Sequence, residues 1–409
     1  MRILHVIPSL AVRYGGPPKA AVEMCEELAR RGERVAIYTT DLDGSGRLDV
    51  PIGRPIFHES GLETRYYRAY PHGSYTFSLP LAAALRDSIA AFDIVHIHSL
   101  YRFSSTIAAF YARRARVPYI VRPHGTLDPY MFSRHRLRKW PYELLFERRN
   151  LECAAAVHFT AAEEMKLAQT LGLAFRGVIA PLGVAVPHGR RPGPEALNSR
   201  WPATRGKKTL LYLGRLTLKK GLDLLAKAYG AISRERDDVH LLIAGPDDEG
   251  YGARVREWLR AERVLNRTTF TGMLLGEHKS IVLGGADIFV LPSFSENFGI
   301  AAVEAMAAGL PIVISNRVNI WREVALAGAG IAVNCDVADL KRALLEVLDN
   351  RALRQEMGQA GRRLASESFS WPSAVDKLMA VYHDIVTRQV NGRSVSGSKS
   401  FVARQPGEA

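Results

Sequence analysis

The sequence predicts an α/β protein made of two consecutive doubly wound domains, each with a parallel sheet covered by helices. Short apolar runs alternate with amphipathic stretches from the N-terminus to about residue 350, which is the rhythm of βαβ units. The alternation stops once, in the Pro-, Gly- and Arg-rich residues 188–207, and then restarts. With 409 residues the chain is also longer than one hydrophobic core usually spans. We therefore expect domains at residues 1–187 and 208–369, joined by a linker at 188–207.

The first domain opens with a buried strand at residues 2–9 and a turn at Gly15 and Gly16. Residues 17–32 predict a helix, because prolines are accepted in a first turn and Gly32 is a typical C-terminal stop. Helical patterns separate most of the strand patterns that follow. These strand patterns are RVAIYTT, DIVHIHS, PYIVRPHG, AVHFTA and GVIAPLG.

The second domain repeats this order, with strand patterns at TLLYLGR, HLLIAGP, TTFTGM, DIFVLPS, PIVIS and GIAV. A last helical pattern at residues 370–388 has no strand after it. The polar, Gly- and Ser-rich residues 389–409 predict a disordered tail. Ligands of doubly wound sheets bind beyond the carboxyl ends of the strands, so candidate site residues are expected there.

The bulk composition narrows the class of protein. Hydrophobic residues make up 47% and charged residues 23%, as in an ordinary folded protein. The net charge of +14 favours an anionic partner such as a phosphate ester, nucleic acid or an anionic membrane surface. Three scattered cysteines argue against a disulfide framework and a zinc site, which indicates a reducing compartment. The N-terminal apolar run is a poor signal peptide, and no run is long enough to span a membrane, so any membrane contact should be peripheral.

Two acids, Glu296 and Glu304, flank a turn and a helical pattern of small residues. Glu296 follows a strand pattern, and Glu304 lies about two turns into the helix. The free backbone amides of Asn297, Phe298 and Gly299 at the helix start form an anion site, while the two carboxylates can accept hydrogen bonds from sugar or ribose hydroxyls. The alternative is a capping acid and an unrelated surface glutamate.

Two cations follow the first strand pattern of the second domain, Arg215 and Lys220. They suit a diphosphate, because arginine offers a planar fork and lysine a point charge. Two solvated loop cations are the alternative, and spacing alone does not choose between Lys219 and Lys220. In the first domain, His96 and His98 share one face of a strand, where packing is as good an explanation as function.

These blocks together resemble the retaining GT-B glycosyltransferases of family 4, the glycosyl transferases group 1. The resemblance rests on LGRL with KKG, FTGML, ADIFVLPS, SENFGIAAVEAMAAGLPIV and the N-terminal Gly-Gly turn, and it covers roughly residues 1–388. It implies the GT-B fold, in which two Rossmann-like doubly wound domains face each other across a cleft. The first domain would serve the acceptor and the second the nucleotide sugar, and the helix at 370–388 would pack back on the first domain.

The resemblance also implies roles for the residues of the second domain. Arg215 and Lys220 would hold the donor diphosphate, Glu296 would contact hydroxyls of the donor sugar, and Glu304 would bind the nucleotide ribose. The amides of residues 297–299 would meet sugar or phosphate oxygens.

In the first domain, the resemblance makes His124 a contact of the donor sugar close to the reacting carbon. Gly15 and Gly16 resemble a glycine-rich loop whose backbone approaches the donor phosphates. The prolines that follow, Pro17 and Pro18, remove amide donors at the helix start, which weakens that expectation.

The implied activity is that of a retaining hexosyltransferase. It would move a sugar from a GDP- or UDP-sugar to a hydroxyl of a glycan or lipid-linked saccharide in polysaccharide, including exopolysaccharide, or glycolipid biosynthesis. Fixed cations would stabilise the leaving diphosphate, so no metal and no other cofactor are expected. The protein would be cytoplasmic, with peripheral contact at the inner face of the plasma membrane. Two alternatives stay open: a non-catalytic nucleotide-sugar or glycan-binding scaffold of the same fold, and a nucleotide-sugar epimerase.

Other patterns bear on metals and partners. Residues 41–49 resemble the start of a calcium loop, but Ile52 stands where that loop needs glutamate. No Gly-x-Gly-x-x-Gly follows the first strand of either domain, which argues against a dehydrogenase. Residues 133–149 mix six Lys and Arg with aromatic residues, which suits an anionic membrane surface or simply a solvated helix face. No nucleic-acid motif accompanies them, so nucleic acid is not expected as a partner.

Overall fold

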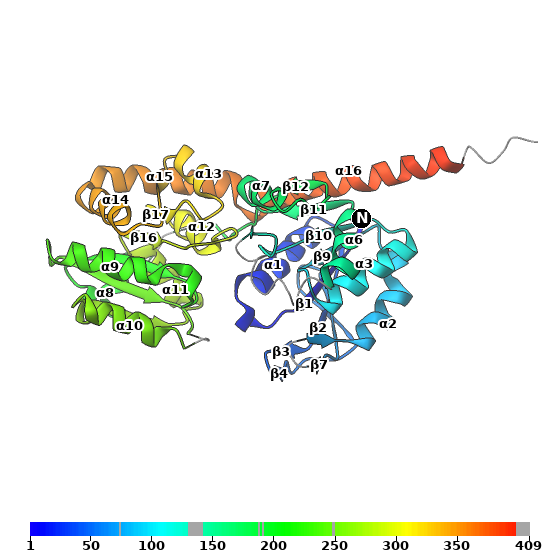
Figure 1. Cartoon of the computed structure of the whole chain (residues 1–409), viewed down its shortest axis with the longest axis horizontal. Coiled ribbons are helices and arrows are strands. Elements are labelled where there is room, and N and C mark those ends of the chain that lie inside the picture. Colours follow the sequence, from blue (N-terminus) through cyan, green and yellow to red (C-terminus); the bar gives the residue numbers. More distant parts are fainter. Residues whose placement is uncertain (73–74, 130–141, 187–188, 190–191, 248–249, 398–409) are drawn as a thin grey trace, which may run out of the picture. The chain divides into compact units, whose positions relative to one another are not determined.

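The computed structural model describes residues 1–409 except 73–74, 130–141, 187–188, 190–191, 248–249 and 398–409 (Figure 1). The chain divides into two compact units. The N-terminal unit comprises Met1–Phe159, Leu167–Ala180 and Val375–Ala409, and the C-terminal unit comprises Thr160–Lys166 and Pro181–Ala374. Each unit has its own mainly parallel sheet, which confirms the predicted α/β class with Rossmann-like domains.

The main sheet of the N-terminal unit has the strand order β12-β11-β10-β9-β1-β2-β6-β5. Neighbouring strands are parallel, except that β5 and β6 are antiparallel. The chain builds outward from β1 first on one side and then on the other, so the strand order reverses between β1 and β9, the place where ligands of such sheets bind. The strands are β1 (Arg2–Ser9), β2 (Arg34–Thr40), β5 (Pro55–Phe57), β6 (Glu63–Tyr67), β9 (Ile94–His98), β10 (Tyr119–Arg122), β11 (Ala156–Phe159) and β12 (Gly177–Ile179).

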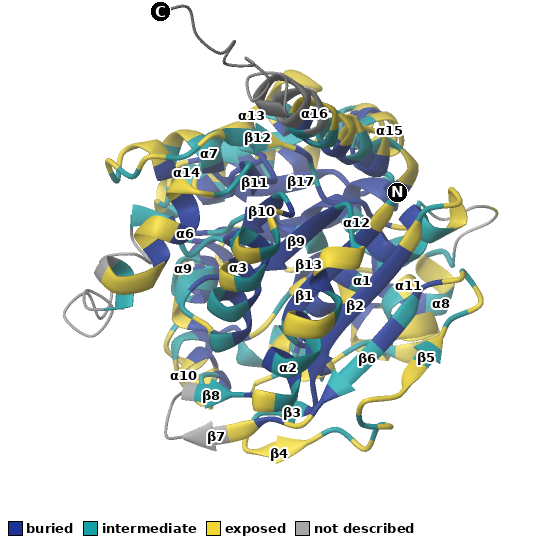
Figure 2. Ribbon diagram, turned by 90° about the vertical axis from the view of Figure 1, so that its right-hand side faces the viewer, coloured by how far each residue is buried: buried dark blue, intermediate teal, exposed yellow. Residues whose placement is uncertain are grey.

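The centre of this sheet forms the core of the unit. Figure 2 shows β9, β1 and β2 as buried and the edge strand β5 as largely exposed. The side chains of β1 and β9 are buried on both faces, which explains why these strands appear in the sequence as continuous apolar runs. The longer helices that precede residue 160 are α1 (Gly16–Arg30), α2 (Leu79–Ser88) and α3 (Phe103–Ala115). Two helices, α6 (Arg148–Glu152) and α7 (Ala162–Gln169), are shorter.

The sheet of the C-terminal unit is parallel throughout, in the order β15-β14-β13-β16-β17-β18. Its strand order reverses between β13 and β16. The strands are β13 (Lys208–Leu213), β14 (Val239–Ala244), β15 (Thr268–Gly272), β16 (Ile288–Leu291), β17 (Ile312–Ser315) and β18 (Gly330–Val333). The helices are α8 (Pro194–Arg200), α9 (Leu222–Ser233), α10 (Gly252–Ala261), α11 (Gly276–Gly285), α12 (Ile300–Ala307), α13 (Trp321–Leu326), α14 (Val337–Asp349) and α15 (Arg351–Ser368).

The segment expected as a linker contains structure of its own. Helix α8 lies within residues 188–207, and its Leu197 is buried. A Cβ atom on Gly285 of α11 would lie 2.6 Å from the Leu197 Cβ, so the two helices are in close contact. Proline and glycine content suggested an irregular linker, but residues 194–200 form a short helix whose buried Leu197 packs against α11 of the C-terminal unit.

The last helix, α16 (Trp371–Gly397), continues past the end at residue 388 that the sequence suggested. From Val375 onward it belongs to the N-terminal unit. Val375, Leu378, Tyr382 and Ile385 are buried at three- and four-residue intervals, which is one face of a helix. The remainder of the predicted tail, residues 398–409, lies outside the described residues.

The pattern that resembles a calcium loop forms a short hairpin of β3 (Leu42–Asp43) and β4 (Gly46–Arg47). The buried Asp41 carboxylate accepts a hydrogen bond from the Ala69 amide at 2.7 Å. It also lies 3.4 Å from the Arg47 guanidinium and 3.3 Å from that of Arg68. Asp41 therefore ties the hairpin to the sheet. Within the described residues, no helix is both long and apolar enough to cross a membrane.

Candidate active site

The candidate site of the C-terminal unit lies in the loops that follow β13 and β16, the neighbouring strands at which the strand order reverses. The loop after β13 carries exposed Arg215 and the 3₁₀ turn η5 (Leu218–Lys220). The loop after β16 carries Glu296. The Lys220 Nζ donates a hydrogen bond to the Glu296 carboxylate, so these two residues meet although 76 positions separate them. Of the two adjacent lysines, Lys220 makes this contact.

The close approach of these loops depends on Gly221. Its φ of +67° lies in the left-handed region, which glycine adopts without steric cost. A Cβ atom at this position would lie 2.0 Å from the Pro292 carbonyl oxygen. The Phe294 amide also donates to the Lys219 carbonyl at 2.8 Å. The absence of a side chain at residue 221 therefore lets η5 dock against the end of β16.

The Glu296 carboxylate is mostly buried, beside three cations. Burial acts to raise its pKa, but the charges of Lys220, Lys219 and Arg215 outweigh burial and leave the pKa below its usual value. The backbone is held on both sides, because the Glu296 amide donates to the Arg317 carbonyl at 2.9 Å and its carbonyl accepts from the Asn319 amide at 3.0 Å. Glu296 is therefore a fixed carboxylate, able to accept hydrogen bonds from hydroxyl groups.

The lowered pKa predicts how acid affects the stability of the protein. A carboxyl whose pKa is lowered on folding stabilises the folded state above its unfolded pKa of about 4.3, and this contribution is lost as the pH falls through the lowered value. We expect the difference in unfolding free energy between wild type and Glu296→Gln to be constant from about pH 7 to pH 5 and to shrink below about pH 4. Urea unfolding at several pH values measures this difference. If it grew on acidification, the pKa of Glu296 would be raised rather than lowered.

Glu304 lies on α12 with a cationic partner that the sequence did not indicate. The Lys279 Nζ of α11 is 2.6 Å from the Glu304 carboxylate, and both side chains are mostly buried. Nothing in the spacing of Lys279 marks it, because the ion pair joins side chains of two different helices, α11 and α12. Glu304 is therefore paired with Lys279, which is a further basic residue at this site.

The start of α12 has the geometry of a tight turn. Gly299 precedes the helix with a φ of +77°, and a Cβ there would lie 3.0 Å from Val318. The Phe298 side chain is 2% exposed. Its ring packs edge-on against the Phe369 ring, with 5.5 Å between the ring centroids. Phe298 thus anchors the loop through its side chain and has only backbone groups to offer a ligand. The buried Asn297 Oδ1 has no hydrogen-bond partner among the described residues.

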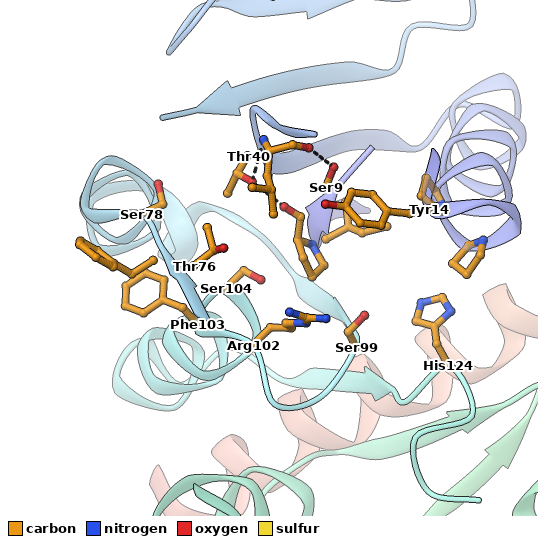
Figure 3. A pocket seen from close by; sticks show the side chains of 16 residues that line it. Ser9, Tyr14, Thr40, Thr76, Ser78, Ser99, Arg102, Phe103, Ser104 and His124 are labelled. Carbon is orange, nitrogen blue, oxygen red and sulfur yellow. Dashed lines mark hydrogen bonds between the residues drawn. The ribbon is translucent and has the colours of Figure 1, made fainter. Parts of the chain in front are cut away.

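The N-terminal unit contains a pocket near the carboxyl ends of β1 and β9 (Figure 3). Figure 3 shows Tyr14, Arg102, Phe103 and His124 around it. Pro17 and Pro18 of the first turn of α1 also line this pocket. Its wall is a mixture of aromatic, proline and hydroxyl side chains, with Arg102 as a cation, which suits a ligand that is partly apolar and partly polar.

Gly15 and Gly16 lie beside this pocket in sequence but do not line it. Gly15 has a φ of +78° and connects a 3₁₀ turn, η1 (Val12–Tyr14), to α1. Its amide already donates to the Val12 carbonyl at 2.9 Å. The amide of Gly15 is therefore already engaged within the chain.

His124 lines the pocket from the turn after β10. Its φ of +52° is uncommon for a residue with a side chain. The His124 Nε2 lies 3.1 Å from the His98 Nδ1, which orients the imidazole. The sequence-predicted residues thus form two groups: Gly15, Gly16 and His124 belong to the N-terminal unit, and Arg215, Lys220, Asn297, Phe298, Gly299, Glu296 and Glu304 belong to the C-terminal unit.

Two family models match the chain. The glycosyl transferase 4-like domain matches residues 15–183, and glycosyl transferases group 1 matches residues 195–364. Among curated proteins, the chain is 26% identical over 397 residues to the GDP-mannose:cellobiosyl-diphosphopolyprenol alpha-mannosyltransferase of Xanthomonas oryzae pv. oryzae, covering 94% of this chain and 97% of that protein. It is 36% identical over 196 residues to the glycogen synthase of Mycobacterium tuberculosis, a match that covers only 45% of either protein.

Solved structures share the architecture of the whole chain. Sucrose-phosphate synthase from Thermosynechococcus elongatus superposes with a TM-score of 0.75 at 21% identity, covering 95% of this chain and 100% of that one. Anabaena HepE in complex with UDP and glucose gives a TM-score of 0.72 at 16% identity, covering 94% and 100%. The matched family models and the shared architecture confirm the resemblance seen in the sequence, and the chain belongs to the glycosyl transferases group 1 family and adopts the GT-B fold.

Proposed function

We propose that this chain is a retaining, metal-independent glycosyltransferase that moves a sugar from a nucleoside diphosphate to a hydroxyl of a glycan or lipid-linked saccharide. The observation that carries the proposal is the mostly buried contact of Lys220 with Glu296, next to Arg215, at the carboxyl ends of β13 and β16. Cations there suit a diphosphate, and a carboxylate held ionised suits sugar hydroxyls.

Buried oxygens around this contact support a polar ligand. The hydroxyl oxygens of Thr217 and Ser293 and the amide oxygen of Asn297 are buried and have no hydrogen-bond partner within the described part of the chain. Thr217 lies in the loop of Lys220, and the other two lie in the loop of Glu296. Buried polar atoms are normally satisfied, so a bound molecule with hydroxyl and phosphate groups would complete this site.

The proposed reaction breaks the bond between the anomeric carbon and the diphosphate oxygen, and the electron pair stays on the diphosphate. Lys220 and Arg215 would stabilise the negative charge that develops there, which is the largest contribution such a site can make. The acceptor hydroxyl forms the new bond on the face that the diphosphate leaves, and a phosphate oxygen of the donor takes its proton. Because fixed side chains compensate the charge, no metal is required.

The two glutamates would bind hydroxyls rather than transfer protons. The pKa of Glu296 is lowered, which makes it a weak base at neutral pH. We assign it to hydroxyls of the donor sugar and Glu304 to those of the nucleotide ribose. Lys279 already contacts Glu304 and would stay close to the nucleotide.

The donor and acceptor classes are supported by the names of similar proteins. The Xanthomonas relative is described as using GDP-mannose with a diphosphopolyprenol-linked saccharide, and HepE was solved with UDP. We therefore propose a GDP- or UDP-sugar as donor and a lipid-linked saccharide as acceptor, in polysaccharide or glycolipid biosynthesis.

A lipid-linked acceptor would bring the protein to the inner face of the plasma membrane. Most of the basic segment 133–149 lies outside the described residues. In its described part, Leu145 and Phe146 are exposed on the π-helical turn η3 (Glu143–Glu147), next to exposed Arg148 and Arg149. We propose that these residues contact anionic lipid headgroups. Substituting Leu145 and Phe146 with glutamate should abolish co-sedimentation with anionic vesicles, and unchanged co-sedimentation would exclude this contact surface.

Donor binding can be tested by thermal unfolding. At a concentration one hundred times its Kd, the correct nucleotide sugar should stabilise the protein by about 2.7 kcal/mol and raise its Tm measurably. We expect one of the GDP- or UDP-sugars to do so, and the shift to be reduced in Lys220→Ala. A protein that no nucleotide sugar stabilises would contradict the proposal, and an epimerised sugar released in the absence of acceptor would indicate an epimerase instead.

A further inference from the structure

Five histidines and one tyrosine of the N-terminal unit form a continuous chain of hydrogen bonds that ends at His124. At the far end, the His158 Nε2 lies 2.7 Å from the Ala180 carbonyl oxygen. The links then run from His158 Nδ1 to His96 Nε2 at 3.3 Å, His96 Nδ1 to Tyr382 Oη at 2.6 Å, Tyr382 Oη to His5 Nε2 at 3.4 Å, His5 Nδ1 to His98 Nε2 at 3.0 Å, and His98 Nδ1 to His124 Nε2 at 3.1 Å.

The sheet brings these residues onto one face. His5 of β1 is in register with His96 of β9, and His98 lies two residues further along the same strand. On β10, Arg122 is in register with His98. On the next strand, β11, Val157 is in register with Val121 of β10, so His158 stands beside Arg122. In parallel strands, residues in register point to the same side. Tyr382 of α16 completes the chain from above this face.

The imidazoles of this chain are neutral. His5, His96 and His98 are 0% exposed, and His158 is 1% exposed. Burial, and after it the charge of Arg122, lowers the pKa of both His5 and His158 to about 3. Burial likewise holds the pKa values of the other three histidines well below the ordinary value. Each ring therefore carries one proton, and each has one donor nitrogen and one acceptor nitrogen.

The Ala180 carbonyl fixes where every proton sits. A carbonyl oxygen can only accept, so the His158 Nε2 must donate to it, and the His158 Nδ1 is left as an acceptor. The His96 Nε2 must then donate to that nitrogen, which leaves the His96 Nδ1 to accept the Tyr382 hydroxyl proton. The Tyr382 oxygen then accepts from the His5 Nε2. In the same way the His5 Nδ1 accepts from the His98 Nε2, and the His98 Nδ1 accepts from the His124 Nε2. All five histidines should thus carry the proton on Nε2.

We infer that this chain of hydrogen bonds holds His124 as the Nε2-protonated tautomer, so that its Nδ1 accepts a hydrogen bond from a ligand hydroxyl and does not donate to a phosphate. His98, His5, Tyr382, His96 and His158 are then positioning residues, and only His124 touches the ligand. That the hydroxyl belongs to a sugar rests on the proposed function. The assignment of the protons does not, because it follows from the carbonyl of Ala180 and the distances.

A buried metal ion is the competing use of these side chains. One ring nitrogen from each of His5, His96 and His98 lies within 4.8 Å of those of the other two. However, all six of their ring nitrogens already have a hydrogen-bond partner, either another imidazole or the Tyr382 hydroxyl. A metal would have to displace several of these links. The hydrogen-bonded arrangement therefore accounts for the cluster without an ion.

Nitrogen NMR tests the proton positions directly. In the full-length protein labelled with ¹⁵N-histidine at pH 7, long-range proton–nitrogen correlations should show a protonated Nε2 and an unprotonated Nδ1 for all five residues, each assigned with its single His→Gln variant. A protonated Nδ1 on any of the five would overturn the inference. So would stoichiometric binding of Zn²⁺ that changes the signals of His5, His96 and His98 together.

The variant Tyr382→Phe tests whether the chain acts on His124. It removes the central hydroxyl but keeps the ring in place. We expect His158 and His96 to keep their protons on Nε2, because Ala180 still fixes them, while His5, His98 and His124 become mixtures of both tautomers. Turnover should fall about tenfold, with the KM of the donor changed less than about twofold.

Tyr119→Phe is the matched control. Tyr119 is also a buried tyrosine of the N-terminal unit, and its hydroxyl donates to the Asn150 carbonyl at 2.7 Å, away from the histidines. This variant should lose stability but retain turnover and all five tautomers. If Tyr382→Phe retained turnover and all five tautomers as Tyr119→Phe does, the chain of hydrogen bonds would have no role in positioning His124. If no sugar transfer were detectable in the wild type, the proposed function would fail while the NMR result would still decide the tautomers.

Discussion

Replacing Lys220 with alanine is expected to lower turnover about 10²- to 10³-fold while the protein stays folded. The loss follows from the position of its ammonium group, which contacts the Glu296 carboxylate beside Arg215 where the diphosphate would lie. Removing a fixed charge that stabilises a developing negative charge costs the transition state about 3–4 kcal/mol. The measurement is steady-state transfer from the donor identified by thermal unfolding, compared with far-UV circular dichroism of the variant.

Lys341→Ala serves as the matched control for this substitution. Lys341 also pairs with a glutamate of the C-terminal unit, Glu235, but the Glu235 side chain is 52% exposed and the pair lies between α14 and the region after α9. Surface ion pairs contribute little to stability, so this variant should resemble the wild type in turnover and Tm. If Lys220→Ala and Lys341→Ala had equal turnover, Lys220 would not bind the diphosphate.

Replacing Gly221 with alanine should cost the C-terminal unit about 3 kcal/mol or more of folding free energy and most of the activity. Two effects add. A left-handed backbone costs about 1–2 kcal/mol for a residue with a side chain. In addition, the new Cβ would lie 2.0 Å from the Pro292 carbonyl oxygen, so η5 would have to move away from β16. Chemical unfolding measures the loss of folding free energy, and steady-state turnover measures the loss of activity.

Gly206→Ala separates these effects. Gly206 has a φ of +68°, almost the same as Gly221, but a Cβ atom there would meet nothing within 4 Å. It should therefore show the backbone cost alone and keep its turnover. Equal stabilities of the two alanine variants would mean that contact with Pro292 is not what requires glycine at position 221.

The sequence was sufficient for the fold because the central parallel strands, β1 and β9 in one unit and β13 and β16 in the other, are buried on both faces and so appear as apolar runs. It also indicated Arg215, Lys220 and Glu296, because residues just after strands in such a sheet gather at one edge. Once the loops meet, charge decides the pairing, and Lys220 reaches Glu296. These predictions needed only local patterns and the strand order.

Features that depend on lateral packing could not be predicted in this way. Lys279 of α11 meets Glu304 of α12, and no spacing within either helix shows that. The chain of histidines required the register of β1, β9 and β11 together with Tyr382 of α16. Helix α8 and the last turns of α16 were not predicted, because their polar, Pro and Gly residues are typical of irregular segments.

The division of the chain between the two units has a consequence for synthesis. The N-terminal unit includes helix α16 from Val375 onward, and both segments of the C-terminal unit, Thr160–Lys166 and Pro181–Ala374, precede that residue in the chain. On the ribosome, the unit whose first strand emerges earliest is therefore finished last, since Tyr382 must leave the exit tunnel before the imidazoles of His5 and His96 can be bridged. Until then a nascent chain would expose the apolar surface that α16 covers in the folded protein. No single cut in the chain yields both units intact.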